Sequence, residues 1–280
     1  MQSERSTAET VAEDYYDSRD ADRFYELIWG GEDIHIGLYG DDACAIADAS
    51  RNTVAAMALR LEGLAPGSRV LDLGSGYGGA ARYLAERFDC RVTCVNLSEV
   101  QNIRNRRRNQ EQDLAERIRV VHGSFERIPA RAESADVIWS QDSFLHSARK
   151  RDVLSEIARV LKPGGQVIFT DPMQADDCSA AMLRKVYERL SLDSLASPSW
   201  YRREFARLGF EELEWCDLSP ELRRHYAAVR TELRGKYVEL RNEITPAYLD
   251  RMLVGLNNWV IAADAAYLRW GILHFRKPFA

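Results

Sequence analysis

Several hydrogen-bonding side chains gather in the stretch SQDSFLHS, which starts at position 140 and follows the apolar run ADVIW. They are Gln141, Asp142, Ser143 and His146. An amide can orient a ligand, a carboxylate can accept hydrogen bonds, and an imidazole can exchange a proton near neutral pH. Such groups indicate either an ordinary loop or the floor of an active site. The strands and helices predicted around them distinguish these two possibilities.

Short apolar runs alternate with amphipathic stretches on both sides of this segment. We expect strands at 69–74, 91–96, 118–123, 135–140 and 165–171, and helices between them at 78–89, 98–114 and 149–161. This alternation predicts an α/β fold with a mostly parallel sheet and helices on both faces. Ligands of such sheets bind at the carboxyl ends of the strands. The polar stretch directly after 135–140 therefore lies where a ligand is expected.

The chain on either side of this core is mostly helical. We expect helices over 13–30 and 43–63 before it, over 177–192 and 198–208 after it, and through most of 219–268. The runs at 210–218 and 267–277 are predicted to be late strands that join the sheet in antiparallel orientation. The sequence thus predicts an α/β core covered by a helical cap.

Composition and charge exclude several classes of protein. The chain has 280 residues and a net charge of −5, which argues against a nucleic-acid binder that needs a basic face. The arginines at 104, 106, 107 and 108 are more typical of a solvated helix face. The five cysteines form no CxxC pair and the histidines no HExxH motif, which disfavours a metal site. We see no signal peptide and no membrane span, so a cytoplasmic location is expected.

A glycine-rich turn follows the first predicted strand in VLDLGSGYGG. Gly74, Gly76 and Gly79 match the GxGxxG pattern, in which glycines let the backbone approach a ligand closely. A dinucleotide site would carry an acidic residue after the second strand, where this chain has Asn96. Asp72 adds a carboxylate that would repel a phosphate and attract an ammonium group. The turn therefore favours a ligand that carries an ammonium group.

The ensemble of motifs resembles the class I S-adenosylmethionine-dependent methyltransferases. The segments VLDLGSGYGG, VNLSEVQ, GSFERIP, ADVIWSQDSFLH and EIARVLKPGGQVIFTD have the order and spacing of that family. More narrowly, YYDSRDADRFYELIWGGEDIHIGLY, QDSFLHS and WGILHFRKP are similar to the sarcosine and dimethylglycine N-methyltransferases that make glycine betaine. The phosphoethanolamine methyltransferases share the outline.

The resemblance implies a Rossmann-like class I methyltransferase sheet with helical cap insertions. It divides the chain into an N-terminal helical cap over 1–65, an S-adenosylmethionine-binding core over 66–175, and substrate-cap helices with terminal strands over 176–280 that complete the sheet. It also implies the cofactor-binding residues, which are Asp72, Gly74, Gly76, Asn96, Leu97, Gln101, Ser124, Phe125 and Gln141. Tyr16 and His146 match the lid contact over the reacting centre in the phosphoethanolamine relatives and are the expected catalytic residues.

The substrate class implied by the resemblance sets further requirements on the cap. An amine nucleophile needs positioning and exclusion of water more than acid–base help, although its ammonium form must first lose a proton to His146 or to water. A substrate carboxylate calls for an arginine, and the nascent quaternary ammonium favours aromatic faces. The expected substrate-binding residues are Tyr25, Asp142, Tyr201, Arg202, Tyr226 and Trp270, with Trp29 and Arg203 as neighbours. Asp142 can alternatively serve as an N-cap.

The leading hypothesis is stepwise N-methylation of sarcosine and dimethylglycine to glycine betaine, an osmoprotectant, with S-adenosylmethionine as donor. A phosphoethanolamine-type or natural-product methyltransferase is the alternative, although Pro172 stands where the phosphobase relatives carry tyrosine. A non-catalytic module that binds S-adenosylmethionine is the third reading. The expected partner is a small amino-acid substrate, with no nucleic acid and no membrane, and the sequence makes no prediction of oligomeric state.

Overall fold

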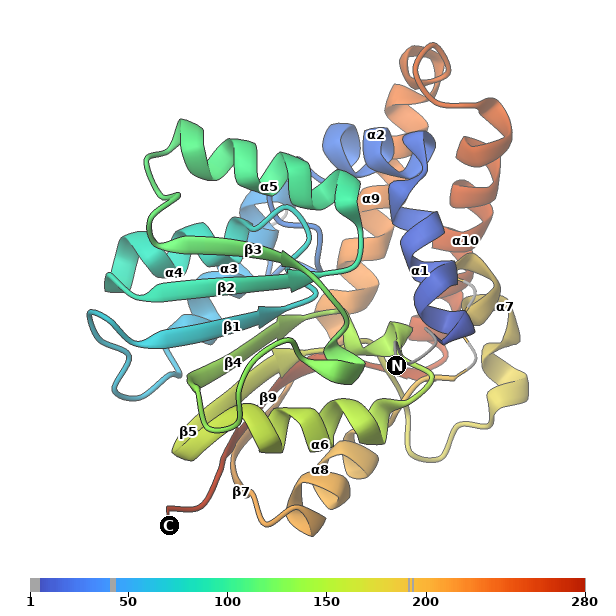
Figure 1. The fold of residues 1–280 in the computed structure, drawn as a ribbon. Helices are drawn as coiled ribbons and strands as arrows, with labels where there is room; N and C mark the ends of the chain where they lie inside the picture. Colours follow the sequence, from blue (N-terminus) through green and yellow to red (C-terminus); the bar gives the residue numbers. More distant parts are fainter. Residues whose placement is uncertain (1–5, 41–43, 191, 193, 280) are drawn as a thin grey trace.

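A seven-stranded sheet forms the centre of the protein in a computed structural model, which describes residues 6–40, 44–190, 192 and 194–279 (Figure 1). The strand order is β3-β2-β1-β4-β5-β9-β7. The strands are β1 (Arg69–Leu73), β2 (Arg91–Asn96), β3 (Ile118–His122), β4 (Ala135–Gln141), β5 (Leu161–Thr170), β7 (Glu211–Asp217) and β9 (Gly271–Arg276). A second sheet pairs β6 (Met173–Gln174) with β8 (Leu268–Arg269).

The first five strands of the large sheet are parallel, and β9 runs antiparallel to both β5 and β7. The predicted parallel sheet with late antiparallel strands is therefore confirmed. In the register, Asp72 of β1 lies opposite Cys94 of β2 and Trp139 of β4. The carboxyl ends of these three strands consequently meet at one edge, and the glycine turn and the SQDSFLHS stretch both begin there.

Helices cover both faces of the large sheet. On one face lie α3 (Ile46–Ala58), α4 (Gly79–Phe88) and α5 (Glu99–Glu111), and on the other lie α6 (Lys150–Val160) and α8 (Pro198–Arg207) (Figure 1). Val54, Leu84 and Trp139 belong to the buried cluster on the first face, whereas Ile157, Phe169 and Phe205 belong to the cluster on the second. These apolar contacts exclude water from both faces of the sheet, which is the main source of stability in such a layered fold.

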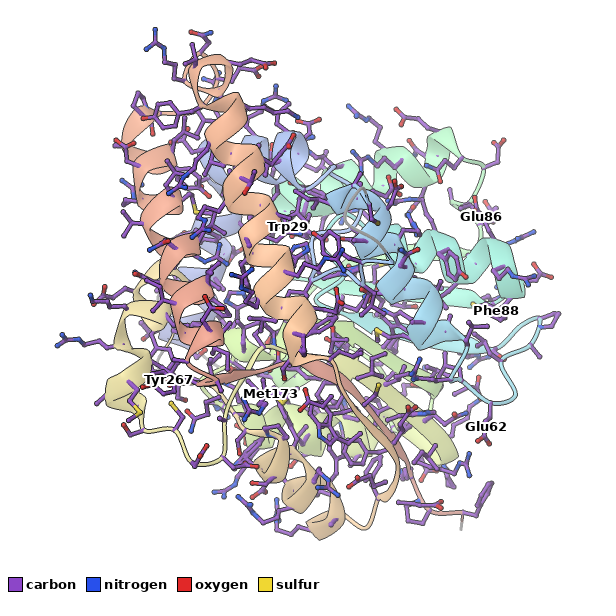
Figure 2. The ribbon with its side chains drawn as sticks, turned by 180° about the vertical axis from the view of Figure 1, so that it is seen from behind. Trp29, Glu62, Glu86, Phe88, Met173 and Tyr267 are labelled. Carbon is purple, nitrogen blue, oxygen red and sulfur yellow. The ribbon has the colours of Figure 1, made fainter. Side chains whose placement is uncertain are left out.

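A layer of helices stands at the carboxyl ends of the parallel strands. It consists of α1 (Thr7–Asp17), α2 (Arg19–Ile28), α7 (Ala180–Leu190), α9 (Ser219–Leu240) and α10 (Pro246–Asp264), which share one buried cluster with Trp29 and Trp270 (Figures 1 and 2). Figure 2 shows Trp29 beside α9, where its ring centroid lies 5.0 Å from that of His225. Among the described residues, no helix is both long and apolar enough to cross a membrane.

Two predicted helices differ from the structure. The helix expected over 13–30 begins earlier and is interrupted at Ser18, whose extended backbone and hydroxyl cap the start of α2 at the Ala21 amide. The helix expected over 43–63 is α3, which ends at Ala58. Positions 43 and 191, which fall within two predicted helices, lie outside the described residues.

The arginines of α5 attach the helical layer to the core, so the expectation of a merely solvated face was wrong for two of them. Arg104 pairs with Asp22 and lies 2.8 Å from Glu26, both in α2. Arg108 lies 3.2 Å from Glu32. Both guanidinium groups are centred 5.7 Å from the Tyr77 ring, a distance at which a cation is attracted to an aromatic face.

Candidate active site

The glycine turn after β1 packs closely against neighbouring loops. Gly74 has a φ of +73° and Gly76 one of +52°, a region that residues with a side chain rarely adopt. A Cβ atom at Gly74 would lie 2.4 Å from Ser143 Cβ, and one at Gly79 would lie 2.1 Å from Asp33 Oδ1. The turn therefore requires glycine both for its backbone conformation and for its contact with the loops at 33 and 143.

A pocket at the carboxyl ends of β1, β2 and β4 brings together most of the predicted cofactor-binding and catalytic residues. Its lining includes Gly74, Gly76, Asn96, Leu97, Gln101, Phe125 and Gln141, together with Tyr16, Asp142 and His146. Ser124 and Asp72 are not in this lining. The Ser124 hydroxyl caps the short helix that starts at Phe125 and accepts from the Glu126 amide at 3.0 Å. Ser124 therefore shapes the loop and does not line the pocket.

Asp72 lies at one end of this site, in a small adjoining pocket that it shares with Gly74, Gly76 and Gln141. Its side chain is buried, and burial raises the pKa of its carboxyl group to about 7. Asp72 Oδ2 and Gln141 Nε2 are both buried, and neither has a hydrogen-bond partner among the described residues. One orphan acceptor and one orphan donor side by side suit a ligand that carries both an ammonium and a carboxylate group.

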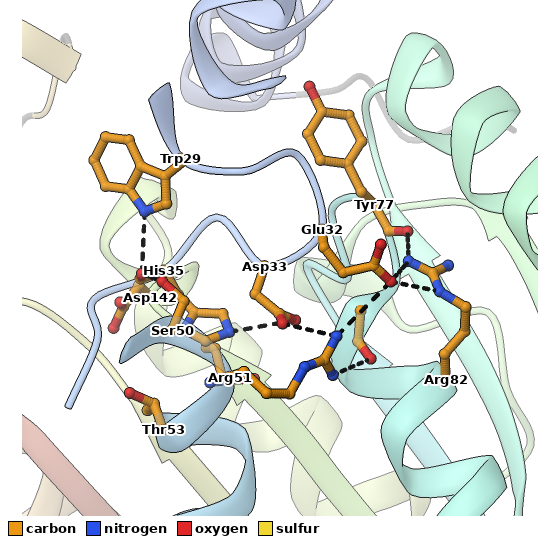
Figure 3. Close-up of polar contacts among 12 residues, drawn as sticks. Trp29, Glu32, Asp33, His35, Ser50, Arg51, Thr53, Tyr77, Arg82 and Asp142 are labelled. Carbon is orange, nitrogen blue, oxygen red and sulfur yellow. Dashed lines mark hydrogen bonds and ion pairs between the residues drawn. The ribbon is translucent and has the colours of Figure 1, made fainter. Parts of the chain in front are cut away.

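A charged network closes the outer side of that small pocket (Figure 3). Arg51 lies 3.0 Å from Asp33 and donates to the Gly79 carbonyl at 3.0 Å, while His35 lies 3.7 Å from Asp33. Burial opposes ionisation of Asp33, but His35 and Arg51 outweigh it and hold the pKa of its carboxyl below the ordinary value. An ionised Asp33 near Asp72 makes this end of the site favourable for a cation.

Asn96 and Gln101 orient each other at the end of β2. Asn96 Nδ2 donates to Gln101 Oε1 at 3.0 Å. The helix α1 is fastened directly beside them, because Asp17 at its end accepts from the Ser98 hydroxyl and from the Val100 amide at 3.3 Å. The N-terminal helix therefore lies over the pocket as a cover, with Tyr16 on its inner side.

Tyr16 and His146 meet over the pocket. The Tyr16 hydroxyl lies 3.0 Å from His146 Nε2, and their ring centroids are 5.4 Å apart. Burial, helped by the charges of Lys150 and Arg189, lowers the pKa of His146 to about 3, whereas burial raises the pKa of Tyr16 above its ordinary value. At neutral pH the imidazole is therefore uncharged and shares a hydrogen bond with the tyrosine hydroxyl. This geometry fixes the cover in place.

Asp142 joins three segments that are far apart in the sequence. Its φ is +49°, its Oδ2 accepts from the Ile36 amide at 2.7 Å, and its Oδ1 accepts from Trp270 Nε1 at 2.7 Å. Ser143, not Asp142, is the N-cap of the following turn. Both carboxylate oxygens thus accept hydrogen bonds from the protein and hold the loop at 142 in place, while Asp142 also lines the pocket. The predicted substrate-binding roles of Asp142 and Trp270 stay predictions.

Tyr201 and Arg202, which the sequence predicted to bind the substrate, lie away from the pocket. Both are on α8, which packs on the opposite face of the sheet from α4. Tyr201 is buried there and donates to Asp171 Oδ2 at 2.8 Å. The Arg202 side chain is 48% exposed and pairs with Glu212 at 2.7 Å. An arginine that is exposed and already paired with a carboxylate is poorly placed to bind a buried substrate.

Aromatic side chains from the helical layer form a cage beside Tyr16. The Tyr25 ring lies 5.7 Å from that of Tyr16 and 5.3 Å from that of Trp29. The Tyr15 hydroxyl lies 3.3 Å from the hydroxyls of both Tyr25 and Tyr248. Tyr226 is buried in the same cluster. Sequence reasoning identified Tyr25 and Tyr226 but missed Tyr15 and Tyr248, which only the packing of α1 against α10 brings together.

Sequence reasoning also missed Arg189 of α7, whose guanidinium lies over the ring of Tyr226 at 5.2 Å from its centroid. A signal was present, because Leu183, Val186 and Leu190 mark the buried face of α7 and position 189 falls three residues after Val186. An arginine at such a position points toward the protein interior more than toward solvent.

Comparison with known proteins places this site in a family. Residues 71–169 match a family model described as a methyltransferase domain. The chain is 49% identical to a sarcosine/dimethylglycine N-methyltransferase of Halorhodospira halochloris and 50% identical to one of Aphanothece halophytica, and each match covers 95% of this chain and 96% of the relative. The chain belongs to the sarcosine/dimethylglycine N-methyltransferase family.

Solved structures agree with the N-methyltransferase assignment. A crystal structure from Galdieria sulphuraria, assigned provisionally as a sarcosine dimethylglycine methyltransferase, is 40% identical with a TM-score of 0.90, and the match covers 95% of this chain and 100% of that one. A phosphoethanolamine N-methyltransferase from Haemonchus contortus has a TM-score of 0.84 at 19% identity, covering 98% of this chain and 61% of that one. The second likeness shows only a shared fold. The Rossmann-like class I methyltransferase fold and its helical insertions are thus confirmed.

Proposed function

We propose that this N-methyltransferase methylates sarcosine and dimethylglycine at nitrogen, with S-adenosylmethionine as methyl donor and glycine betaine as final product. The observation that carries the proposal is the identity of about half of all positions over nearly the whole length of two sarcosine/dimethylglycine N-methyltransferases. The pocket at the strand ends and the aromatic cage beside it support this proposal of two adjoining sites, one for the cofactor and one for the substrate.

The orphan polar atoms at the strand ends fit the amino-acid part of S-adenosylmethionine. Asp72 Oδ2 would accept from its ammonium group and Gln141 Nε2 would donate to its carboxylate. Asn96 with Gln101 would hold the ribose, and Leu97 with Phe125 would hold the adenine between apolar surfaces. Gly74 and Gly76 line the pockets between these ends, where the methionine part of the cofactor would lie.

The reaction requires little acid–base catalysis from the protein. When bound, S-adenosylmethionine supplies a sulfonium methyl group: the amine lone pair forms the new C–N bond while the electrons of the broken C–S bond remain on sulfur. His146, with a pKa of about 3, is too weak a base to hold the proton that the substrate ammonium must lose. We therefore assign that proton to solvent before closure, and we assign Tyr16 and His146 to holding the cover and excluding water.

The aromatic cage supports a substrate whose nitrogen becomes cationic. The rings of Tyr16, Tyr25 and Trp29 lie tilted against one another next to the pocket, with Tyr25 and Trp29 buried and Tyr16 packed against them. An aromatic face attracts a quaternary ammonium through the ring quadrupole, and the attraction is about 2 kcal/mol where water is excluded. The cage would therefore stabilise the methylated product and the charge that develops before it.

The proposed domain organisation follows from the separate cofactor and substrate sites. We propose a helical cap over 1–65, a cofactor-binding core over 66–175 and a substrate cap with terminal strands over 176–280. The cluster that joins Phe24 and Trp29 to Val186, Leu233 and Trp259 supports a single cap made from both ends of the chain. We further propose a cytoplasmic location, an amino-acid substrate without a nucleic-acid partner, and synthesis of an osmoprotectant as the physiological role.

The proposal is tested by incubating the purified protein with S-adenosylmethionine and, separately, glycine, sarcosine, dimethylglycine and phosphoethanolamine. We expect mass spectrometry to detect dimethylglycine and glycine betaine from sarcosine, and glycine betaine from dimethylglycine. Methylation of phosphoethanolamine alone would replace the proposal with a phosphobase activity. Binding of the cofactor without product from any of the four would contradict the substrate class.

A further inference from the structure

Arg189 is set into the interior of the helical layer from α7. Its Nε and Nη1 atoms are buried and have no hydrogen-bond partner among the described residues. Its guanidinium carbon lies 5.2 Å from the ring centroid of Tyr226 and 5.4 Å from that of Trp259. The structure thus holds a permanent cation between two aromatic faces.

No carboxylate of the described residues forms an ion pair with Arg189, whereas the buried Arg82 pairs with Glu32 at 2.6 Å. Trp259 Nε1 is a further buried donor that lacks an acceptor in the described part of the chain. Removing a charge from water without a partner is costly, and aromatic faces offset only part of that cost. Three orphan donors with a full positive charge therefore point to an anionic ligand.

The neighbouring helix α10 leaves space for the Arg189 side chain. Gly255 of α10 has no side chain, and a Cβ atom there would lie 2.7 Å from both Cγ and Cδ of Arg189. The aliphatic part of the arginine consequently packs directly on the backbone of α10, which fixes the direction of the guanidinium. A flexible surface arginine would have no need of such a gap.

Arg189 stands between the outside of the protein and the reacting centre. It lines a groove of about 1310 Å³ between α1, α7 and α10, which Tyr15 and Tyr248 also line. On its inner side its charge acts on Tyr16, Tyr25 and His146, lowering the pKa of each relative to burial alone. An anion bound to Arg189 would therefore lie next to the aromatic cage, within the same region as the cover over the cofactor pocket.

We infer that Arg189, assisted by Trp259 Nε1, binds the substrate carboxylate and so directs the amine toward the cofactor. This inference rests on the proposed function, because it assumes an amino-acid substrate. The guanidinium offers two parallel donors to the two carboxylate oxygens, a match that a lysine ammonium cannot reproduce. Arg189 of α7 then makes the enzyme prefer an amino acid over an amine that lacks a carboxylate.

The test compares steady-state kinetics of the wild type with Arg189→Met and Arg189→Lys. We expect Arg189→Met to raise KM for dimethylglycine by about 10²- to 10³-fold, as expected when one partner of a buried ion pair is removed. Arg189→Lys keeps the positive charge but loses the two parallel donors of the guanidinium, so we expect KM for dimethylglycine to rise about tenfold or more. The Kd of S-adenosylhomocysteine, measured by calorimetry, should change less than twofold in both variants.

A substrate analogue and a control variant make the test specific for the carboxylate. Dimethylaminoethanol has the same tertiary amine with a hydroxyl in place of the carboxylate. We expect the wild type to methylate it only slowly, and we expect Arg189→Met to methylate it at the same rate as the wild type. Arg241→Ala removes an exposed cation from the rim of the same groove and should leave KM for dimethylglycine within twofold. Should Arg189→Met fail to fold, Arg189→Lys carries the comparison.

The outcomes separate this inference from the proposed function. If the wild type methylates sarcosine and dimethylglycine but both Arg189 variants keep the wild-type KM, then Arg189 does not bind the carboxylate and the proposed function stands. If the wild type methylates neither, the proposed function itself fails. An equal loss for dimethylglycine and dimethylaminoethanol would mean that Arg189 only supports the cage, which would also overturn the inference.

Discussion

The pocket at the strand ends and the cage in the helical layer are built in different ways. The pocket is made of backbone turns and strand ends, and segments of a few residues such as 72–76, 96–101 and 141–143 supply its lining. The cage is made of single side chains from α1, α2, α7, α9 and α10, separated by up to about 240 positions. A binding site formed by local turns can be recognised in a sequence, whereas one formed by packed helices depends on how those helices meet.

The largest effect that sharpens this comparison is expected for Gly74→Ala. The alanine would adopt a φ of +73° and place its Cβ 2.4 Å from Ser143, so the turn must move away from the loop at 143. We expect cofactor affinity to fall by about 10²-fold or more, because strain of about 1–2 kcal/mol adds to the steric clash. Calorimetric titration with S-adenosylhomocysteine measures the loss.

Gly67→Ala is a matched control for that experiment. Gly67 has a φ of +81°, but a Cβ atom there would meet nothing within 4 Å. We expect this variant to lose about 1–2 kcal/mol of stability, by thermal unfolding, and to keep the wild-type cofactor affinity. Equal losses of affinity in the two variants would mean that general destabilisation, and not the turn itself, limits cofactor binding.

Asp72 makes cofactor binding depend on pH. Its carboxyl has a pKa of about 7 in the folded protein, raised by burial, and it must be ionised to pair with an ammonium group. Since the protonated form dominates below pH 7, we expect the affinity for S-adenosylhomocysteine to be about tenfold weaker at pH 6 than at pH 8. The same raised pKa means that the ligand-free protein loses stability as pH rises from about 4 through 7.

The Asp72→Asn variant isolates that carboxylate. We expect its affinity at pH 8 to be about tenfold lower than that of the wild type, and its affinity to be nearly constant between pH 6 and 8. The measurement is calorimetric titration in two buffers of different ionisation enthalpy, in which only the wild type should release a proton on binding near pH 6. A variant with the full pH dependence would show that another group titrates.

Gly255→Ala probes the cage without touching the pocket. Its new methyl group would displace the Arg189 side chain, so we expect KM for dimethylglycine to rise about tenfold while the Kd of S-adenosylhomocysteine stays constant. Gly235→Ala in α9 is the control, because a Cβ atom there meets nothing within 4 Å and KM should not change. If KM for dimethylglycine rose equally in both variants, the cause would be a change in helix propensity and not the displacement of Arg189.

The last variants concern the contact between the two regions. His146→Ala removes the hydrogen-bond partner of the Tyr16 hydroxyl and should lower kcat by about tenfold, whereas His146→Gln, whose amide can donate or accept a hydrogen bond, should lower it less. Because the His146 pKa is about 3, the wild-type kcat should show no imidazole titration between pH 5 and 9. A kcat that falls on protonation of a group near pH 6.5, and loses that dependence in His146→Ala, would make His146 a general base.

The core was predictable because its signals are local. Five apolar runs of six or seven residues, each followed by polar residues, are enough to place the strand ends, and Gly74 and Gly76 mark the turn after the first of them. Asp142 was placed correctly at the strand end, where it lines the pocket, but its part in joining distant segments was not predictable. Its contacts with Ile36 and Trp270 join positions more than 100 residues apart, and no local pattern indicates them.

The cap was harder to predict for the same physical reason. Ser18 divides what reads as one continuous helical pattern, because its side chain caps the next helix. Arg202 was expected to bind the substrate carboxylate, yet its side chain is half exposed and pairs with Glu212. Arg189 was overlooked because arginines on amphipathic helices usually lie in solvent, and its burial depends on the gap at Gly255.

The central claim is that the strand-end pocket binds the cofactor and Arg189 separately binds the substrate carboxylate. Its most direct test is calorimetric titration of dimethylglycine into wild-type and Arg189→Met proteins, both saturated with S-adenosylhomocysteine. We predict measurable binding to the wild type, a loss of at least about 10²-fold in the variant, and the same Kd of S-adenosylhomocysteine for both. Equal affinity of the two proteins for dimethylglycine would contradict the claim.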